Sequence, residues 1–403
     1  MLRKIDTKQL EPGMFLHELC GTWLNHPFWR TSFLLKSETQ IAKIRDSGIA
    51  EAVIDTEKGL DINAPVATAA VSVVSAPAPK PAAPKYTPMD AEMAQASNIV
   101  AESKKAVVSM FNEARMGKAI EADSVMPLVE EISSSVARNP GALISIARLK
   151  TADDYTYMHS VAVCGLMIAL ARQLDLDEAQ IREAGMAGLL HDVGKMAIPL
   201  EVLNKPGKLT DEEFTLIKGH PAAGHEMLVG GRGVSEISLD VCLHHHEKID
   251  GTGYPHKLAG DQISLFARMG AICDIYDAVT SERPYKKGWD PAEAVHKMAT
   301  WSKGHFDERI FQAFVKSVGI YPVGSLVRLQ SGRLGVVIEQ TPSSLLAPRI
   351  KVFFSIKSQT RMPPEVVDLS RPSNSDRIVA QEDPAKWGFT DLNTLWGGDK
   401  AAV

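Results

Sequence analysis

The chain's hydrophobic pattern has a helical period across its middle and a strand-like period near both ends. Between residues 89 and 149, apolar residues recur at roughly helical spacing, which predicts two connecting helices. The pattern stays helical almost throughout to about residue 321, and the longest apolar run, Val161–Ala171, predicts a buried helix that ends at Arg172. A capping box at Thr210 and Glu213 predicts a further helix start.

Short β-like runs lie on either side of this helical region. FLLK and AEAVID near the N-terminus flank a helix-like stretch, SETQIAKIRDSG, which together predict a small α/β module. Beyond Pro322 the runs SLVRLQ, RLGVVIEQ and IKVFFSI are separated by glycine, proline and serine, so a small β-rich region is expected there. The fold class is therefore mainly α, with β structure at both ends.

A change of composition separates the first module from the rest. The segment APVATAAVSVVSAPAPKPAAPKYTP holds almost only small residues and proline, which bury too little surface to fold and form an extended linker. The predicted parts are a small α/β module, 1–63; an Ala/Pro-rich linker, 64–88; connecting helices, 89–148; a helical domain, 149–322; a β-rich region, 323–370; and a polar tail, 371–403.

Composition excludes several classes of protein. The 403 residues carry a formal net charge of −5, which disfavours binding to a nucleic acid polymer. The four cysteines form no C-x-x-C pair, which argues against a disulfide framework or a cysteine zinc site and favours a reducing compartment. The start of the chain lacks the apolar stretch of a secretory signal, and no run is long enough to span a membrane. A cytoplasmic protein is expected.

Candidate chemistry gathers in the helical region as a set of histidines and aspartates. A single histidine beside an apolar helix is more often a packed side chain than a ligand, but a set close to helix ends is typical of a pocket. Imidazole and carboxylate ligands suit iron, manganese, nickel or zinc, and the absence of cysteine argues against a structural zinc site. The set consists of His159, His191, Asp192, His220, His245, His246 and Asp274.

Two short patterns support the interpretation that these histidines and aspartates line a binding site. His191 and Asp192 end an apolar helix and are followed by Lys195, so potential ligands lie beside a cation that is able to meet phosphate. The run LHHHEKIDGTGYP holds three successive imidazoles, which cannot all face one core. At least one of them must face a pocket or solvent.

These motifs together resemble the HD-GYP domain phosphodiesterases, a branch of the HD metal-dependent phosphohydrolases. The match runs from about Asp154 to Tyr285 and includes, in the family's order, DDYTYMHS, LLHDVGKMAIP, LNKPGKL, IKGHPAAGHEML, HHEKIDGTGYP and ICDIYDAVTSERPYK. The N-terminal segment also resembles the small uncharacterised domain that often precedes HD-GYP domains. The resemblance implies an all-helical catalytic domain that hydrolyses cyclic di-GMP to pGpG, GMP or both.

By family pattern the resemblance implies two divalent transition-metal ions, iron or manganese first and nickel or zinc as further candidates. One ion would be held by His159, His191, Asp192 and Asp274. The other would be held by Asp192, His220, His245 and His246. Asp192 would then bridge the ions, which share a hydroxide nucleophile. His244 is assigned to the surroundings or the surface, and Asp277 to supporting its helix.

The resemblance also implies substrate contacts. Catalytic roles fall to Asp192 and to Lys195, whose ammonium would lie near the scissile phosphate. The implied substrate-binding residues are Lys195, Gly253, Tyr254, Pro255, Arg283 and Lys286. Some family members carry a glutamate four residues before the first ligand histidine and hold a third metal ion. Tyr155 occupies that position here, so a binuclear site is expected and the final product stays open.

Four other functions remain as alternatives. The HD fold also serves hydrolases of other nucleotides, although the GYP loop and the second set of histidines argue against them. A non-catalytic cyclic di-GMP receptor, a scaffold and an oxygen-activating di-iron protein are less consistent with a complete ligand set and Lys195. The module at 1–63 is the expected site for a protein partner or signal, and family analogy places the pathway in biofilm, motility or virulence control.

Overall fold

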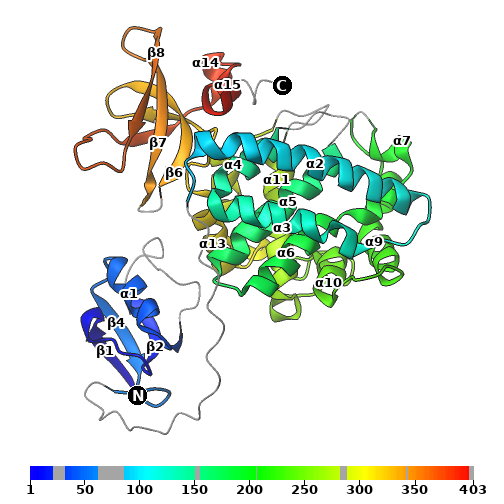
Figure 1. The fold of residues 1–403 in the computed structure, drawn as a ribbon, viewed down its shortest axis with the longest axis horizontal. Coiled ribbons are helices and arrows are strands. Elements are labelled where there is room, and N and C mark those ends of the chain that lie inside the picture. The colour runs from blue at the N-terminus through cyan, green and yellow to red at the C-terminus, as the bar shows by residue number, and fades with distance from the viewer. Residues whose placement is uncertain are drawn as a thin grey trace. The chain divides into compact units, whose positions relative to one another are not determined.

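The computed structural model describes residues 1–20, 32–61, 86–149, 155–205, 207–281, 288–341 and 344–398. The chain divides into two compact units, Met1–Ala83 and Pro84–Val403 (Figure 1). The predicted linker at 64–88 lies outside the described residues apart from its last three positions.

The first unit is the predicted α/β module. Its antiparallel sheet has the strand order β1-β4-β2-β3. Ile41 and Ile44, three positions apart on the helix, are fully buried in one apolar cluster with Leu16 and Ile54 of the strands. The elements are β1 Leu2–Asp6, η1 Thr7–Gln9, β2 Phe15–Cys20, β3 Phe33–Leu34, α1 Glu38–Asp46 and β4 Glu51–Asp55.

The second unit begins with a bundle of helices, which confirms the mainly α fold class. Three helices, not two, precede the catalytic segment, because Pro140 starts a separate helix whose Gly141 N–H is capped by Asn139. Within the described residues, no helix is both long and apolar enough to cross a membrane. The helices are α2 Met89–Arg115, α3 Ala122–Arg138, α4 Pro140–Arg148, α5 Tyr155–Gln173, α6 Glu178–Leu190, η3 Val193–Ala197, α7 Leu200–Leu203, α8 Asp211–Lys218, α9 His220–Val229, α10 Glu236–His244, η4 Gly260–Gln262, α11 Leu265–Thr280, α12 Pro291–His305 and α13 Glu308–Val318.

Helix α5 is the centre of this bundle, as its apolar sequence predicts. It is buried from Met158 to Ala171 and packs against α4, α6 and α11 (Figure 1). Glycine sets the distance to α6: a Cβ on Gly188 would lie 2.9 Å from the backbone oxygen of Val163. The end of α6 is thereby held against the middle of α5.

A five-stranded antiparallel sheet with the order β8-β7-β6-β5-β9 follows the bundle. The tail, predicted only as polar, supplies the edge strand β9 and buries Phe389 and Trp396. Buried Glu339 of β6 accepts hydrogen bonds from Tyr86 Oη at 2.5 Å and from the Met89 N–H at 2.9 Å, so the sheet is fixed to the start of α2. These elements are β5 Leu326–Leu329, β6 Arg333–Thr341, β7 Ser344–Ser355, β8 Thr360–Asp368, β9 Ile378–Gln381, α14 Pro384–Trp387 and α15 Leu392–Gly397.

Candidate metal centre

All seven predicted metal-binding side chains meet in one cluster inside the bundle. They come from the second turn of α5, the residues directly after α6 and α10, the start of α9 and the middle of α11. His159, His191 and Asp192 form one group with ligand atoms within 4.8 Å of one another, and His220, His245 and His246 form a second such group. Asp274 joins the first group, since its Oδ1 lies 3.0 Å from His159 Nε2.

Asp192 lies between the two groups and faces both. Its Oδ2 is 3.3 Å from His159 Nε2 and 3.4 Å from His191 Nε2. Its Oδ1 is 3.2 Å from His220 Nε2 and 3.9 Å from His245 Nε2. One carboxylate oxygen is therefore directed at each group, the arrangement that a shared ligand needs.

Backbone carbonyls fix the orientation of three of the imidazoles. The Nδ1 atoms of His191, His220 and His245 lie 2.8, 2.6 and 3.0 Å from the carbonyl oxygens of Gly188, Ile217 and Val241. A carbonyl oxygen only accepts, so each Nδ1 carries the proton and each Nε2 presents a lone pair to the cluster. Outer hydrogen bonds of this kind orient the histidine ligands of metal ions.

The ring of His159 is oriented by a carboxylate instead. Asp277 Oδ2 lies 2.6 Å from His159 Nδ1, and Ser281 Oγ donates to the other oxygen of Asp277 at 3.3 Å. The sequence predicted that Asp277 supports its own helix. The structure shows in addition that it holds a candidate ligand on α5, 118 positions away in the sequence.

Removing this carboxylate should weaken the centre. We expect Asp277→Ala to lower both metal affinity and kcat/KM about 10- to 100-fold, the usual effect of losing a group that orients a ligand histidine. Asp277→Asn, which keeps a neutral acceptor, should lie between this variant and the wild type. Metal titration combined with hydrolysis rates measures both quantities, and unchanged metal affinity in Asp277→Ala would contradict the role.

Asp192, His245 and His246 are held in the protonation states that bind metal ions, whereas a metal ion has to displace a proton from His159. Burial would raise the pKa of Asp192, but Lys195 and the adjacent imidazoles hold it well below its usual range. Burial by itself would lower the pKa of His159, whereas the carboxylates around its ring raise it to about 9. Burial lowers the pKa of His246 to about 3 and that of His245 well below the ordinary value. Ionised carboxylates and neutral imidazoles are the forms that bind metal ions.

Two polar atoms at the middle of the cluster support the same interpretation. His191 Nε2 and Asp192 Oδ1 are buried, and neither has a hydrogen-bond partner among the described residues. The approach of His220 Nε2 to Asp192 Oδ1 is close enough for an ion pair but does not satisfy that oxygen as a hydrogen bond. A buried polar atom without a partner is costly. A divalent cation between imidazoles and carboxylates would satisfy both atoms.

Close packing of glycine keeps His220 in place. A Cβ on Gly194 would lie 1.9 Å from the His220 oxygen and 2.4 Å from the Gly224 nitrogen, so η3 and α9 touch through their backbones.

We expect Gly194→Ala to lower the free energy of unfolding by about 1–3 kcal/mol and to reduce hydrolysis, because His220 must move. Thermal unfolding and activity assays check this. The matched control is Gly230→Ala, directly after the end of α9, where the nearest atom to an added Cβ would be 3.6 Å away.

The predicted substrate contacts are only partly described. Lys195 Nζ donates to Asp192 Oδ2 at the edge of the cluster, with its side chain 19% exposed. The Tyr254 ring stacks on His246, with ring centroids 4.7 Å apart, so the Gly253–Pro255 loop lies directly over a candidate ligand. Arg283 and Lys286 lie outside the described residues.

The side chains of the three successive histidines, His244, His245 and His246, point in different directions. His245 points into the cluster with none of its side chain exposed, and His246 faces Tyr254. His244 Nδ1 lies 2.7 Å from Asp240 Oδ1, and its Nε2 lies 3.0 Å from the ring of His256. His244 therefore contacts the loop from outside the cluster, as its assignment to the surroundings predicted.

Sequence reasoning missed Lys218. Its Nζ lies 5.9 Å from the centroid of the Tyr254 ring, and the residue is exposed two positions before His220. The same Nζ lies 4.5 Å from the centroid of the Phe214 ring, so a positive charge is held between two aromatic rings beside the loop. The motif IKGHP contains it, but no pattern in that motif indicates that the lysine faces the loop.

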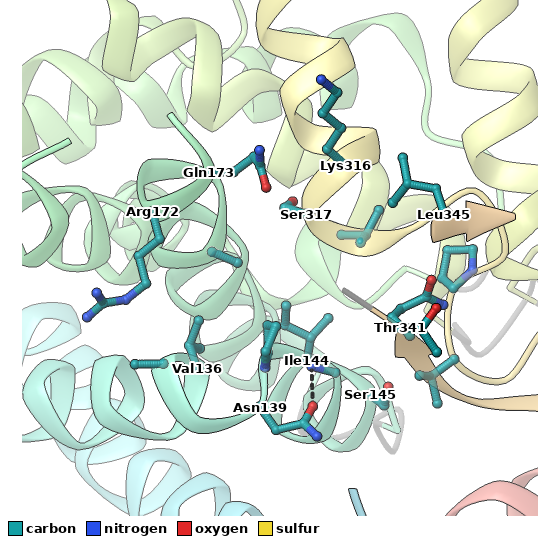
Figure 2. A pocket seen from close by; sticks show the side chains of 18 of the residues that line it. Val136, Asn139, Ile144, Ser145, Arg172, Gln173, Lys316, Ser317, Thr341 and Leu345 are labelled. Atoms are coloured by element: carbon teal, nitrogen blue, oxygen red, sulfur yellow. Dashed lines mark hydrogen bonds between the residues drawn. The ribbon is translucent and has the colours of Figure 1, made fainter. Parts of the chain in front are cut away.

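A separate cavity of about 470 Å³ lies between the helical bundle and the C-terminal sheet (Figure 2). Ile144, Gln173, Ser317 and Leu345 surround it. None of the seven candidate ligands lines this cavity, so its size has no bearing on the metal chemistry.

A helical bundle in which four further histidines and one further aspartate surround a central HD pair defines an HD-type metal-dependent phosphohydrolase. A family model described as HD domain matches residues 133–310, and one described as a domain of unknown function, DUF3391, matches residues 2–125. The second match extends from the α/β module into α2 and the start of α3.

The curated relatives show which kind of phosphohydrolase this chain is similar to. A cyclic di-GMP phosphodiesterase of Pseudomonas aeruginosa is 56% identical over 399 residues, 99% of this chain and 96% of that protein. A cyclic di-GMP phosphodiesterase response regulator of Xanthomonas campestris is 42% identical over 38% of this chain and 40% of its own length. A 3'3'-cGAMP-specific phosphodiesterase of Vibrio cholerae is 33% identical over 47% of this chain and 42% of its own length. The chain belongs to the HD-GYP family of HD domain phosphodiesterases.

Proposed function

We propose that this chain hydrolyses cyclic di-GMP, yielding pGpG, GMP or both. The observation that carries the proposal is Asp192, whose two oxygens are directed at two separate groups of imidazoles. The full-length similarity to a protein named cyclic di-GMP phosphodiesterase supports the choice of substrate.

We assign two divalent transition-metal ions to the cluster, with iron or manganese as the first choice. The first would be bound by His159, His191, Asp192 and Asp274, and the second by Asp192, His220, His245 and His246. When bound, such ions supply a nucleophile at neutral pH and stabilise the charge that develops on a phosphodiester. Tyr155 in place of a glutamate favours two ions over three.

The protein's own groups orient the substrate. The Lys195 ammonium, placed beside Asp192, is suited to neutralise charge on the phosphate or to protonate the departing ribose oxygen. The Tyr254 ring offers a planar surface beside the centre for a guanine base, and stacking of this kind holds single-stranded nucleotides. Arg283 and Lys286 remain predicted contacts from the family pattern.

Product analysis tests the proposal. Protein reconstituted anaerobically with iron(II) or manganese should convert cyclic di-GMP to pGpG or GMP on chromatography, and it should cleave 3'3'-cGAMP more slowly. Chelation should abolish turnover. Tight binding without turnover under every metal would instead support a receptor, and faster cleavage of 3'3'-cGAMP would reassign the substrate.

The α/β module is proposed to receive a regulatory signal or protein partner, and the protein is proposed to act in the cytoplasm. The module has its own apolar cluster and precedes the predicted linker. Deletion of residues 1–63 should change the regulation of cyclic di-GMP turnover in cells. Unchanged activity and regulation would reject the role.

A further inference from the structure

Glu247 is a buried carboxylate that follows directly after two candidate ligands. Only 3% of its surface is exposed. Its Oε1 accepts the backbone N–H of His256 at 2.6 Å, and its Oε2 accepts that of Leu258 at 3.1 Å. Among the described residues no ion pair involves it, so these N–H groups are what compensates its burial. A buried charge is retained only where such partners are present.

The two N–H groups belong to the segment that leaves the GYP loop. His256 follows Pro255 directly, so the carboxylate is hydrogen-bonded to the backbone immediately after Tyr254 and Pro255. On the other side, the Tyr254 N–H donates to the backbone oxygen of His246 at 3.2 Å. The loop is therefore held on both sides of its aromatic residue by two consecutive residues, His246 and Glu247.

The loop also packs directly on the backbone of Glu247. A Cβ on Gly253 would lie 2.5 Å from Glu247 Cα and equally close to the Lys248 nitrogen. Glycine is thus required at this position by close approach, independently of any contact with a ligand.

These contacts fix Tyr254 relative to the metal cluster. Its ring stacks on His246 at an interplanar angle of 29°, and Lys218 Nζ lies 5.9 Å from the ring centroid. Among the described residues, the Glu247 carboxylate makes no hydrogen bond or ion pair with a candidate ligand or with Lys195, so its effect is exerted through the loop.

We infer that Glu247 is a positioning residue for the dinucleotide. It holds the Gly253–Pro255 loop so that Tyr254 meets the part of the substrate beyond the scissile phosphate. This inference rests on the proposed function and deepens it. It separates two properties of the site: phosphodiester cleavage, which belongs to the metal cluster, and recognition of a cyclic dinucleotide, which depends on Glu247.

The test compares two substrates in the full-length, metal-loaded protein. Glu247→Gln keeps the shape of the side chain but turns one acceptor into a donor that faces an N–H. For cyclic di-GMP we expect kcat/KM to fall about 10- to 100-fold, mainly through KM, since small misplacements have effects of this size. Hydrolysis of bis(p-nitrophenyl) phosphate, which is too small to span the cluster and the loop, and the metal content should both change less than about twofold.

A second variant and a control make the result decisive. Gly253→Ala displaces the same loop by steric contact and should likewise raise KM for cyclic di-GMP. Glu131→Gln, at an exposed position on α3, should change neither substrate. Equal losses on both substrates with reduced metal content, or wild-type KM for cyclic di-GMP in Glu247→Gln, would overturn the inference. Wild-type protein that cleaves only the small diester would reject the proposed function itself, before any variant is compared.

Discussion

Replacing Asp192 by asparagine should lower the hydrolysis of cyclic di-GMP by more than about 100-fold. Loss of a group that only orients a ligand already reduces activity or metal affinity about 10- to 100-fold. Asp192 faces both imidazole groups directly, and its negative charge is the one shared between them. The amide keeps the size of the side chain but not the charge, so both metal positions should weaken together.

Two measurements check this result. Metal content by elemental analysis should fall for both ions, and chromatography should show the loss of pGpG and GMP. Asp90→Asn, at an exposed position in the first turn of α2, is the matched control and should retain activity. Loss of activity with full metal content would show that Asp192 acts in catalysis without being a shared ligand.

Truncating Glu92 should destabilise the bundle by about 3 to 5 kcal/mol, the range for breaking a buried pair from one side. Glu92 of α2 is 1% exposed and accepts two hydrogen bonds from Arg138 and one from Ser135 of α3, each at 2.8 Å. In Glu92→Ala the guanidinium stays, four-fifths buried, without its carboxylate. The effect should fall on stability and not on the metal cluster.

Chemical denaturation of wild type and variant gives the free energies of unfolding. Glu102→Ala on the same helix removes an exposed carboxylate paired with exposed Lys105 and should change stability by less than about 0.5 kcal/mol. The double variant Glu92→Ala, Arg138→Ala should recover part of the lost stability, because it no longer buries an unpaired guanidinium. Similar stabilities for Glu92→Ala and Glu102→Ala would show that the pair contributes nothing.

Local sequence signals predicted the main elements correctly where the signals were long or chemically specific. The Val161–Ala171 run became the buried core of α5, and the Thr210 hydroxyl caps α8 through Glu213 as predicted. The signals failed for short elements. Helix α4 was not among the two predicted connecting helices, and the tail was left without structure although it supplies β9. A helix of nine residues or a strand of four carries too few residues for a clear period.

The sequence by itself determined the candidate ligands, since its motifs resemble those of the HD-GYP family and that family's pattern implies these seven residues. Only the tertiary structure decided how they are oriented. Asp277 orients His159 from a position far away in the chain. Backbone carbonyls direct the Nε2 atoms of three other histidines into the cluster, and Glu247 holds the loop through backbone N–H groups. A motif records which residues are present, but the direction of a ring or a carboxylate is set by the neighbours that packing brings to it.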